Sequence, residues 1–297
     1  MATILFTDSI CDLTPEKRKQ YEIEYFRMSF TVAGEDKYAD IDYVDYTPEQ
    51  LYAWIGDTKN HCKTSQVSPE EFRTKMLPHL QNGDDILYIG CALPCSGSVN
   101  TFRLMAEQLK EDFPERKMIG VDSTTVGMGL GRLVMDVSDE RKKGKTIEEL
   151  AQWAEENKEF YHQIGTVEDL TYLRAAGRVS GSAAFFGNII GVKPLIMCDV
   201  PGYNYAYKKV RGSKNATRGQ IEYLKENMVE GVTDVVYVGQ GAAPKQQEEL
   251  CQIIENELHL KTEKYWVGPI IGVSCGPGTA ILYFKGKRIT LDSTKKE

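Results

Sequence analysis

Hydroxyl groups and a glycine lie between a predicted strand and a predicted helix in the first half of the chain. Residues 86–89 form a short apolar run of β-favouring type, which predicts a buried strand. Over residues 99–109, apolar side chains recur at helical spacing. Ser96, Gly97 and Ser98 lie between these two elements. Because backbone N–H groups at a helix start have no partner within the helix, we expect an anion site here, with hydroxyl groups beside it.

The adjacent residues Cys95 and Ser96 raise an alternative hypothesis, an acyl hydrolase or acyltransferase in which one of them is the nucleophile. A serine nucleophile needs a neighbouring base, and the sequence around Ser96 lacks the G-x-S-x-G pattern of hydrolases. No histidine lies in a glycine-rich or strand-end setting; the histidines are His61, His79, His162 and His259. We therefore expect this stretch to bind an anion rather than to catalyse a reaction.

A second group of polar side chains, Thr64, Ser65 and Gln66, comes just before a predicted helix start at Ser68. One interpretation is turn and cap chemistry, which is common for such residues. The other is a second hydroxyl donor directed at the same pocket as Ser96.

Oxygen-bearing side chains that follow predicted strands raise the hypothesis of a magnesium site, since hard cations prefer carboxylate ligands. They are Asp8, Asp12, Asp122 and Ser123. Asp12 fits equally well as a cap before Leu13, and the other carboxylates fit as acceptors of backbone N–H groups at the sheet end. We favour the structural interpretation and predict no metal.

The glycines at positions 127, 129 and 131 do not have the G-x-G-x-x-G spacing of dinucleotide sites, and they do not follow directly on a strand. The chain also lacks the G-x-x-x-x-G-K-[ST] loop that binds nucleotide phosphates. We predict no cofactor and expect the three glycines to mark close packing of a helix.

The elements that position these residues alternate between strands and helices over roughly the first 155 residues, which predicts a parallel sheet with helices on both faces. Capping residues precede proline at Thr14, Thr47 and Ser68, and Glu71 is placed to complete a capping box. One strand is expected over residues 25–32. We assign residues 1–158 to an N-terminal three-layer α/β/α domain with a mainly parallel sheet.

Ligands of such sheets bind outside the carboxyl ends of the strands. The predicted strand ends bring three pairs of residues to that edge, namely Asp8-Ser9, Ser96-Gly97 and Asp122-Ser123.

The second half predicts a different architecture. Residues 193–200 and 203–210 flank Pro201-Gly202 and predict a β-hairpin, with helices and further strands after it. We assign residues 159–297 to a C-terminal two-layer α+β domain with a mixed sheet. Several apolar residues of this domain are candidates for a tunnel wall as well as for ordinary core. They are Phe185, Phe186, Ile189, Ile190, Leu195, Ile196, Ile270 and Ile271.

Composition narrows the classes of function. The formal net charge of −7 argues against a nucleic-acid-binding protein. No run approaches the ~20 apolar residues of a membrane span, so we expect no integral membrane segment. Seven cysteines without regular spacing fit a reducing compartment, which predicts a cytoplasmic protein. A basic cluster after the hairpin is interpreted as a solvated face, with a docking patch for an acidic partner as the alternative: Lys208, Lys209, Arg211, Lys214 and Arg218.

Taken together, these motifs resemble the DegV family of fatty-acid-binding proteins, and the similarity covers nearly the whole chain. In chain order the matching residues are Asp8-Ser9, Asp12-Leu13, Thr64-Ser65-Gln66, Ser68 to Phe72, Ser96-Gly97-Ser98, Val121-Asp122-Ser123, Gly127, Gly129, Leu170 to Leu173, Gly177 to Ser180 and Gly276-Pro277-Gly278.

The resemblance implies a two-domain carrier, not an enzyme, that buries the chain of a long-chain fatty acid such as palmitate. It implies that the positions of Thr64 and Ser96, with the backbone N–H of Gly97, hold the carboxylate. It also implies a fatty-acid kinase as partner, with the positions of Arg178 and Asp40 involved in that exchange. The residues predicted to bind the ligand are Thr64, Ser65, Ser96, Gly97, Ser98 and Ser274.

The chain departs from the family pattern in three places. Ser274 stands where a histidine is usual before the final Gly-Pro-Gly, and a serine cannot carry the charge of an imidazolium. Residues 92–95 differ from the usual loop before Ser96, and Val99 replaces a frequent tyrosine. The first change concerns the handling of an acyl phosphate, and the other two concern the shape of the pocket mouth.

Overall fold

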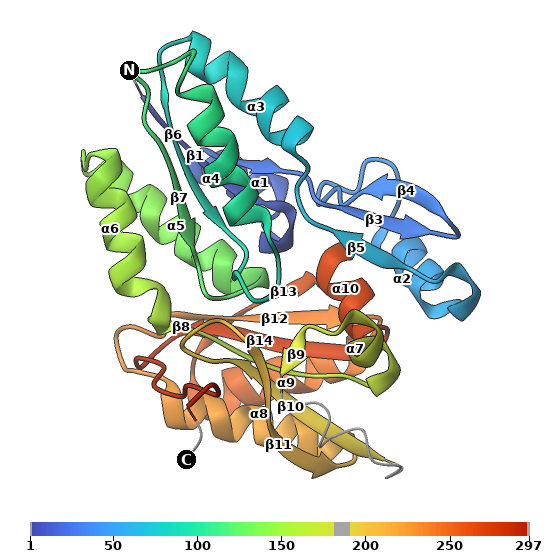
Figure 1. Cartoon of the computed structure of the whole chain (residues 1–297). Helices are drawn as coiled ribbons and strands as arrows, with labels where there is room; N and C mark the ends of the chain where they lie inside the picture. The colour runs from blue at the N-terminus through green and yellow to red at the C-terminus, as the bar shows by residue number, and fades with distance from the viewer. Residues whose placement is uncertain (1, 181–190, 296–297) are drawn as a thin grey trace.

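Three β-sheets organise the chain in the computed structural model, which describes residues 2–180 and 191–295. Figure 1 shows a parallel sheet built from the N-terminal part, a larger sheet built from the second half, and a small sheet beside them. The tunnel-wall candidates Phe185, Phe186, Ile189 and Ile190 lie outside the described residues.

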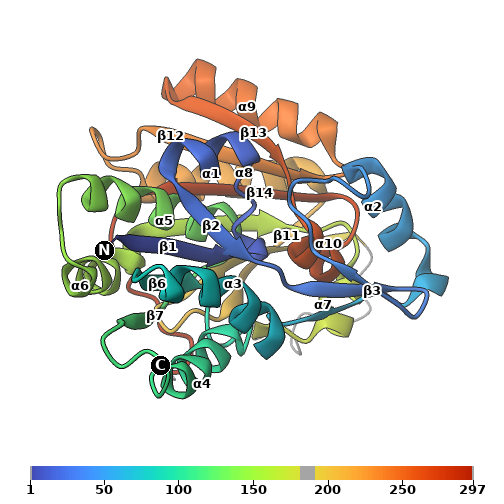
Figure 2. The same cartoon turned by 90° about the horizontal axis from the view of Figure 1, so that it is seen from above.

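The N-terminal sheet is parallel throughout, as predicted. Its strands lie in the order β2 (Ile23–Phe26), β1 (Thr3–Asp8), β6 (Asp85–Gly90) and β7 (Met118–Asp122). Helices cover both faces (Figure 2). On one face lie α3 (Pro69–Gln81) and α4 (Ser98–Leu109), and on the other α1 (Pro15–Tyr21), α5 (Gly127–Lys142) and α6 (Ile147–Asn157). The predicted α/β/α arrangement is confirmed.

The prediction of a single strand over residues 25–32 is wrong, because the chain forms two strands there, β2 and β3 (Ser29–Val32). The chain turns at Arg27 and Met28, because side chains bind both backbone N–H groups there: Arg27 N donates to Glu71 (3.0 Å) and Met28 N donates to Ser9 (3.0 Å). Glu71 also accepts from the Arg27 guanidinium, so it does not complete the expected capping box, although Ser68 still caps α3.

Beyond this turn the chain forms the small antiparallel sheet. Its strand order is β4 (Glu35–Tyr38), β3 (Ser29–Val32) and β5 (Lys63–Ser65), and α2 (Pro48–Gly56) lies in the connection.

The C-terminal sheet is mixed, as predicted, and contains seven strands in the described residues. Their order is β13 (Lys261–Trp266), β12 (Val235–Gly241), β14 (Thr279–Lys285), β8 (Tyr161–Thr166), β10 (Val192–Cys198), β11 (Asn204–Arg211) and β9 (Val179–Ser180). The predicted hairpin is present as β10 and β11. The domain division after residue 158 stays a prediction. None of the helices described here is both long and apolar enough to cross a bilayer.

Helices α8 (Ser213–Asn227) and α9 (Pro244–Leu258) cover one face of this sheet, while α5 contacts β8 and β14 from the other. The remaining helices, α7 (Leu170–Ala176) and α10 (Pro269–Cys275), contact each other. Figure 1 shows α5 between the two large sheets.

The predicted close packing of the α5 glycines is confirmed. A β-carbon at Gly131 would lie 2.7 Å from the backbone oxygen of Cys11, and one at Gly127 would overlap the Tyr283 hydroxyl. Helix α5 therefore touches its neighbours through positions where a side chain has no room.

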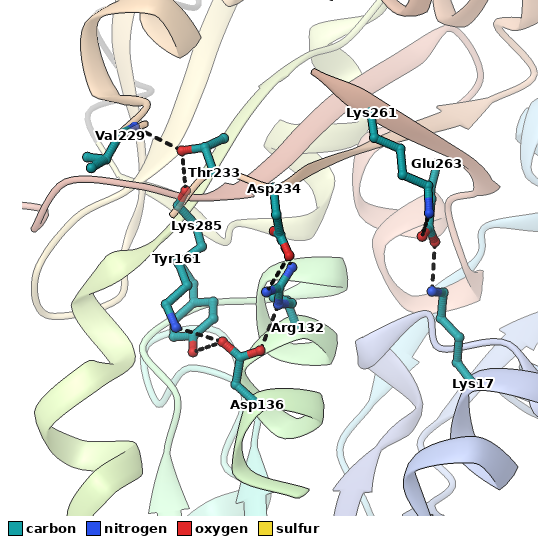
Figure 3. Close-up of polar contacts among 10 residues, drawn as sticks. All are labelled: Lys17, Arg132, Asp136, Tyr161, Val229, Thr233, Asp234, Lys261, Glu263 and Lys285. Carbon is teal, nitrogen blue, oxygen red and sulfur yellow. Dashed lines mark hydrogen bonds and ion pairs between the residues drawn. The ribbon is translucent and has the colours of Figure 1, made fainter. Parts of the chain in front are cut away.

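Polar contacts join α5 to the C-terminal sheet around Asp136 (Figure 3). Its carboxylate accepts from Arg132 (2.8 Å), from the Tyr161 hydroxyl (2.7 Å) and from Lys285 (2.8 Å). Arg132 also forms a two-pronged pair with Asp234. Two strands of the C-terminal sheet are thus attached to one carboxylate of α5.

Candidate functional site

A cavity of about 650 Å³ lies where the end of the parallel sheet, the small sheet and the C-terminal sheet meet. Small-molecule sites usually measure ~300–1,000 Å³. Polar lining residues gather from one strand and three loops, and they include Thr64, Ser65, Gln66, Ser96, Gly97 and Arg178. Most of the remaining wall is aliphatic, and it includes Ile10, Met28, Val126, Val167, Leu173, Ile196, Ile270, Ile271 and Ile281. The cavity therefore combines polar groups with an extensive apolar wall.

The loop from residue 91 to 97 carries the polar groups from the end of β6 to the start of α4. Gly97 occupies the N-cap position, and no side chain caps this helix start. Within residues 2–180 and 191–295, the backbone N–H groups of Gly97 and Val99 have no hydrogen-bond partner. Such a helix start favours a negative charge, so it is compatible with the predicted anion site.

Two carboxylates hold this loop in place, Asp8, which is buried, and Asp122, which is half-buried. Asp8 accepts from the N–H of Cys91 (3.0 Å), and Asp122 accepts from the N–H of Leu93 (3.1 Å) and of Thr124 (3.0 Å). These contacts support the structural interpretation of Asp8 and Asp122, whose carboxylate oxygens accept hydrogen bonds from backbone N–H groups.

Ser98 joins this loop to the second polar segment. Its hydroxyl accepts from the N–H of Val67 (3.2 Å) and lies 2.9 Å from the Ser96 hydroxyl. Gln66 is fixed nearby, because its amide donates to Thr101 on α4 (2.8 Å). These bonds bring residues 64–66 to the cavity beside Ser96. Ser98 itself is fully buried and lies behind Ser96 rather than on the cavity wall.

Thr64 lies in strand β5, where it pairs with Phe30, so the turn-and-cap interpretation is wrong for this residue. Within the described residues its hydroxyl has no protein partner. The structure thus places Thr64 where a second hydroxyl donor was predicted.

The residues predicted from the family pattern lie in different places. Ser274 lines the cavity, and its hydroxyl donates to the Ile270 carbonyl one turn earlier in α10 (3.1 Å). Arg178 lines the cavity with an exposed side chain, and it donates to the Ala176 carbonyl (2.5 Å). Asp40 is not part of the lining. It accepts from backbone N–H groups of its own turn, at residues 42 and 44.

The geometry gives little support to a nucleophile. Burial raises the pKa of the Cys95 thiol to about 11, and its sulfur accepts from Asn204 (3.2 Å). The side-chain neighbour of the Ser96 hydroxyl is Ser98, not a base. Among the described residues, no histidine lines the cavity.

Sequence reasoning identified part of the apolar wall. Ile196, Ile270 and Ile271 line the cavity, whereas Leu195 points to the other face of its strand and packs with the core beneath α8. Ile10, Met28, Leu173 and Ile281 were missed. Ile10 follows Asp8-Ser9 at the carboxyl end of the first strand, and this position at the ligand-binding edge of the sheet could have identified it as a lining residue.

Comparison with known proteins gives a family match over nearly the whole chain. A family model described as "Uncharacterised protein, DegV family" matches residues 3–286. A DegV domain-containing protein of Clostridium perfringens is 27% identical over 284 residues, which cover 95% of this chain and 97% of that protein. A DegV domain-containing protein from Streptococcus pyogenes serotype M3 is 26% identical over 294 residues, which cover 97% of this chain and 99% of that protein.

Solved structures give the same fold. A DegV family protein from Thermus thermophilus, described with fatty acid binding, has a TM-score of 0.85 at 23% identity and covers 96% of this chain and 100% of its own. DegV from Bacillus subtilis, described as a fatty acid binding protein, has a TM-score of 0.84 at 20% identity. The match covers 97% of this chain and 100% of that protein. A stearic-acid-binding protein from Eubacterium ventriosum has a TM-score of 0.82 at 22% identity, covering 96% and 98%.

Proposed function

This chain belongs to the DegV family, and from that premise we propose that it is a carrier that binds one long-chain fatty acid. The acyl chain occupies the cavity, and the carboxylate is held by Thr64, Ser96 and the backbone N–H of Gly97. The observation that carries the proposal is the meeting of these three groups with an aliphatic wall in one cavity of about 650 Å³. Proteins of the same fold that are described as binding fatty acids support it.

The head group needs hydrogen-bond donors, because a carboxylate is not buried without them. Hydroxyl groups at Thr64 and Ser96 and the open N–H groups at the start of α4 supply such donors. Donors to an ionised group form stronger hydrogen bonds than neutral pairs do. The site therefore stabilises the charge of the head group through uncharged hydrogen-bond donors, without a buried cation.

The tail supplies most of the favourable free energy. A chain of about 14 methylenes gains ~11 kcal/mol at ~0.8 kcal/mol for each buried CH₂. Association costs ~4–15 kcal/mol, so tight binding needs a preformed cavity. The aliphatic wall formed by Ile196, Ile270, Ile271 and Ile281 provides one.

The carrier presents the bound acid to a separate kinase. Arg178 is suited to this step, because it lines the cavity and is exposed at the same time. Ser274, in the place of the usual histidine, contributes no positive charge to the head group, so the charge that neutralises an acyl phosphate has to come from Arg178 or from the kinase.

Native mass spectrometry of freshly purified protein tests the binding proposal, with organic extraction to identify the lipid. We expect a mass increase of one fatty acid, or its appearance after incubation with palmitate or oleate. A protein that stays at its own mass under both conditions would not be a fatty-acid carrier.

A further inference from the structure

Two rows of side chains cross the face of the C-terminal sheet that borders the cavity. Gly165 of β8 pairs with Ile281 of β14 and with Ile196 of β10, which gives an apolar row. Two residues before Gly165 in β8, Gln163 pairs with Tyr283 of β14. Residues two apart in a strand point to the same face of the sheet. All five residues line the cavity, so a polar row lies beside the apolar one in its wall.

Hydrogen bonds fix the orientation of the Gln163 amide. Nδ2 of Asn204 donates to the Arg178 carbonyl (3.4 Å). Since a carbonyl oxygen only accepts, Asn204 has to place its nitrogen there and its oxygen Oδ1 on the other side. This oxygen accepts from Nε2 of Gln163 (2.7 Å). The remaining end of the Gln163 amide is its oxygen Oε1, which has no hydrogen-bond partner among the described residues.

The hydroxyl of the neighbouring Tyr283 also has no partner in the part of the chain that the structure describes. A β-carbon at Gly127 would overlap this hydroxyl and would lie 3.0 Å from the side chain of Ile271, another lining residue. The hydroxyl is therefore close to the cavity wall. Burial raises the pKa of Tyr283, so the hydroxyl keeps its hydrogen and can donate it.

These two groups have the properties of one end of an incomplete hydrogen-bond arrangement. Gln163 and Tyr283 are 5% and 1% exposed, and a buried polar group without a partner is unfavourable. The methylenes of an unsubstituted acyl chain cannot pair with either group. A hydroxyl group on the chain can pair with both, because it donates one hydrogen to the Gln163 oxygen and accepts from the Tyr283 hydroxyl.

We propose that Gln163 and Tyr283 form a second polar subsite for a hydroxyl group on the acyl chain, so that the protein prefers a hydroxy fatty acid to an unsubstituted one. The inference rests on the proposed function, with the carboxylate still held at Thr64 and Ser96. The apolar row through Gly165 lies two residues away along β8, about 6.6 Å. The subsite therefore selects the position of the hydroxyl along the chain as well as its presence.

The test is displacement of a fluorescent fatty acid by stearate and by hydroxystearates that differ in the carbon bearing the hydroxyl. For the unaltered protein we expect one isomer, or two adjacent ones, to bind about tenfold more tightly than stearate, because two hydrogen bonds are gained. The oxostearate with its carbonyl at the same carbon should lose most of this preference. Its oxygen accepts from Tyr283 but gives no hydrogen to Gln163.

Tyr283→Phe and Gln163→Leu should each lower the ratio of the stearate Kd to the hydroxystearate Kd toward one. A ratio is used because a general loss of affinity leaves it unchanged. Tyr283→Phe removes a hydroxyl without a partner and keeps the ring, so it decides the test if Gln163→Leu does not fold. Tyr265→Phe is the matched control. Its hydroxyl is also buried and unpartnered within the described residues, but Tyr265 is not part of the lining, so the ratio should stay unchanged.

The outcomes separate the two proposals. If no hydroxystearate binds more tightly than stearate, ordered water rather than ligand pairs with these groups, and the subsite is overturned while the carrier function stands. An unchanged ratio in Tyr283→Phe would overturn it as well. Absence of binding by stearate and by every hydroxystearate would contradict the carrier function itself.

Discussion

The Tyr161 hydroxyl donates to the Asp136 carboxylate at 2.7 Å, and this bond attaches strand β8 of the C-terminal sheet to helix α5 of the N-terminal part (Figure 3). Arg132 and Lys285 approach the same carboxylate. Since Asp136 is mostly buried, its charge is compensated by these partners rather than by water.

We expect Asp136→Asn to lower the free energy of unfolding by about 3 kcal/mol or more, because removing one member leaves buried charges without their partner. Urea unfolding measures the change. The control is Glu222→Gln, a half-exposed acid paired with Arg218, for which we expect less than about 1 kcal/mol. Equal stability of the two variants would mean that the Asp136 contacts contribute nothing.

Ser96→Ala should weaken fatty-acid binding about tenfold or more, because a hydrogen bond to a charged group contributes ~1.5–3 kcal/mol. Fluorescent fatty-acid titration gives the Kd. Ser138→Ala removes another buried hydroxyl, which donates to the Tyr21 carbonyl and lies far in sequence from the cavity loops, and it should leave the Kd unchanged. Unaltered affinity in Ser96→Ala would remove Ser96 from the head-group site.

Gly165→Val should shift binding toward shorter acyl chains. Gly165 lines the cavity opposite Ile281, and a β-carbon there would lie 3.1 Å from the Ile281 side chain. Each methylene that no longer fits costs ~0.8 kcal/mol, or about fourfold in Kd. We would compare stearate with laurate. Adding Ile281→Ala returns space and should restore stearate, whereas an unchanged stearate-to-laurate ratio in Gly165→Val would place the tail elsewhere.

Arg178→Ala should keep the lipid but reduce its phosphorylation by a fatty-acid kinase, since the exposed guanidinium borders the cavity. The assay follows acyl phosphate formation with purified kinase, with the Kd measured in parallel. Arg103→Ala, an exposed arginine that is not part of the lining, is the control. An unaffected transfer rate in Arg178→Ala would contradict the role.

His162 should make the protein less stable in acid. Burial lowers its pKa to about 4 from 6.5, against the raising effect of its bond to the Lys287 carbonyl. The unfolded chain therefore binds a proton at a higher pH than the folded one, and stability present above pH 6.5 is lost as the pH falls toward 4, by about 3 kcal/mol. Unfolding at several pH values should show less of this loss in His162→Gln than in the unaltered protein. The exposed His61→Gln is the control.

Local patterns were sufficient to predict the two larger sheets. Alternation of strands with helices, and capping residues before proline, gave the parallel sheet and its helices, and the Pro201-Gly202 turn gave the hairpin. The break at Arg27 and Met28 was not visible, because it depends on Glu71 and Ser9, which are distant in sequence. The small sheet was missed for the same reason.

The polar end of the site was more predictable than the apolar end. Hydroxyl groups beside a helix start identify themselves by type and spacing, as Ser96 and Gly97 do. An isoleucine in a cavity wall has the same local pattern as one in a core, so Ile281 could not be told from Leu282, its neighbour on the opposite face. The role of Ser98 behind Ser96 also needed the fold, since its partner Val67 belongs to another segment.

The glycine-faced helix α5 limits how the molecule can release a cargo. Because α5 is in direct contact with both large sheets, spreading them apart would uncover the surfaces that Gly127 and Gly131 keep in close approach. The side away from α5, where α7 and α10 border the cavity, can move at lower cost. We therefore expect loading and unloading to be governed by motions of these two short helices, with the two sheets behaving as a fixed frame throughout the cycle.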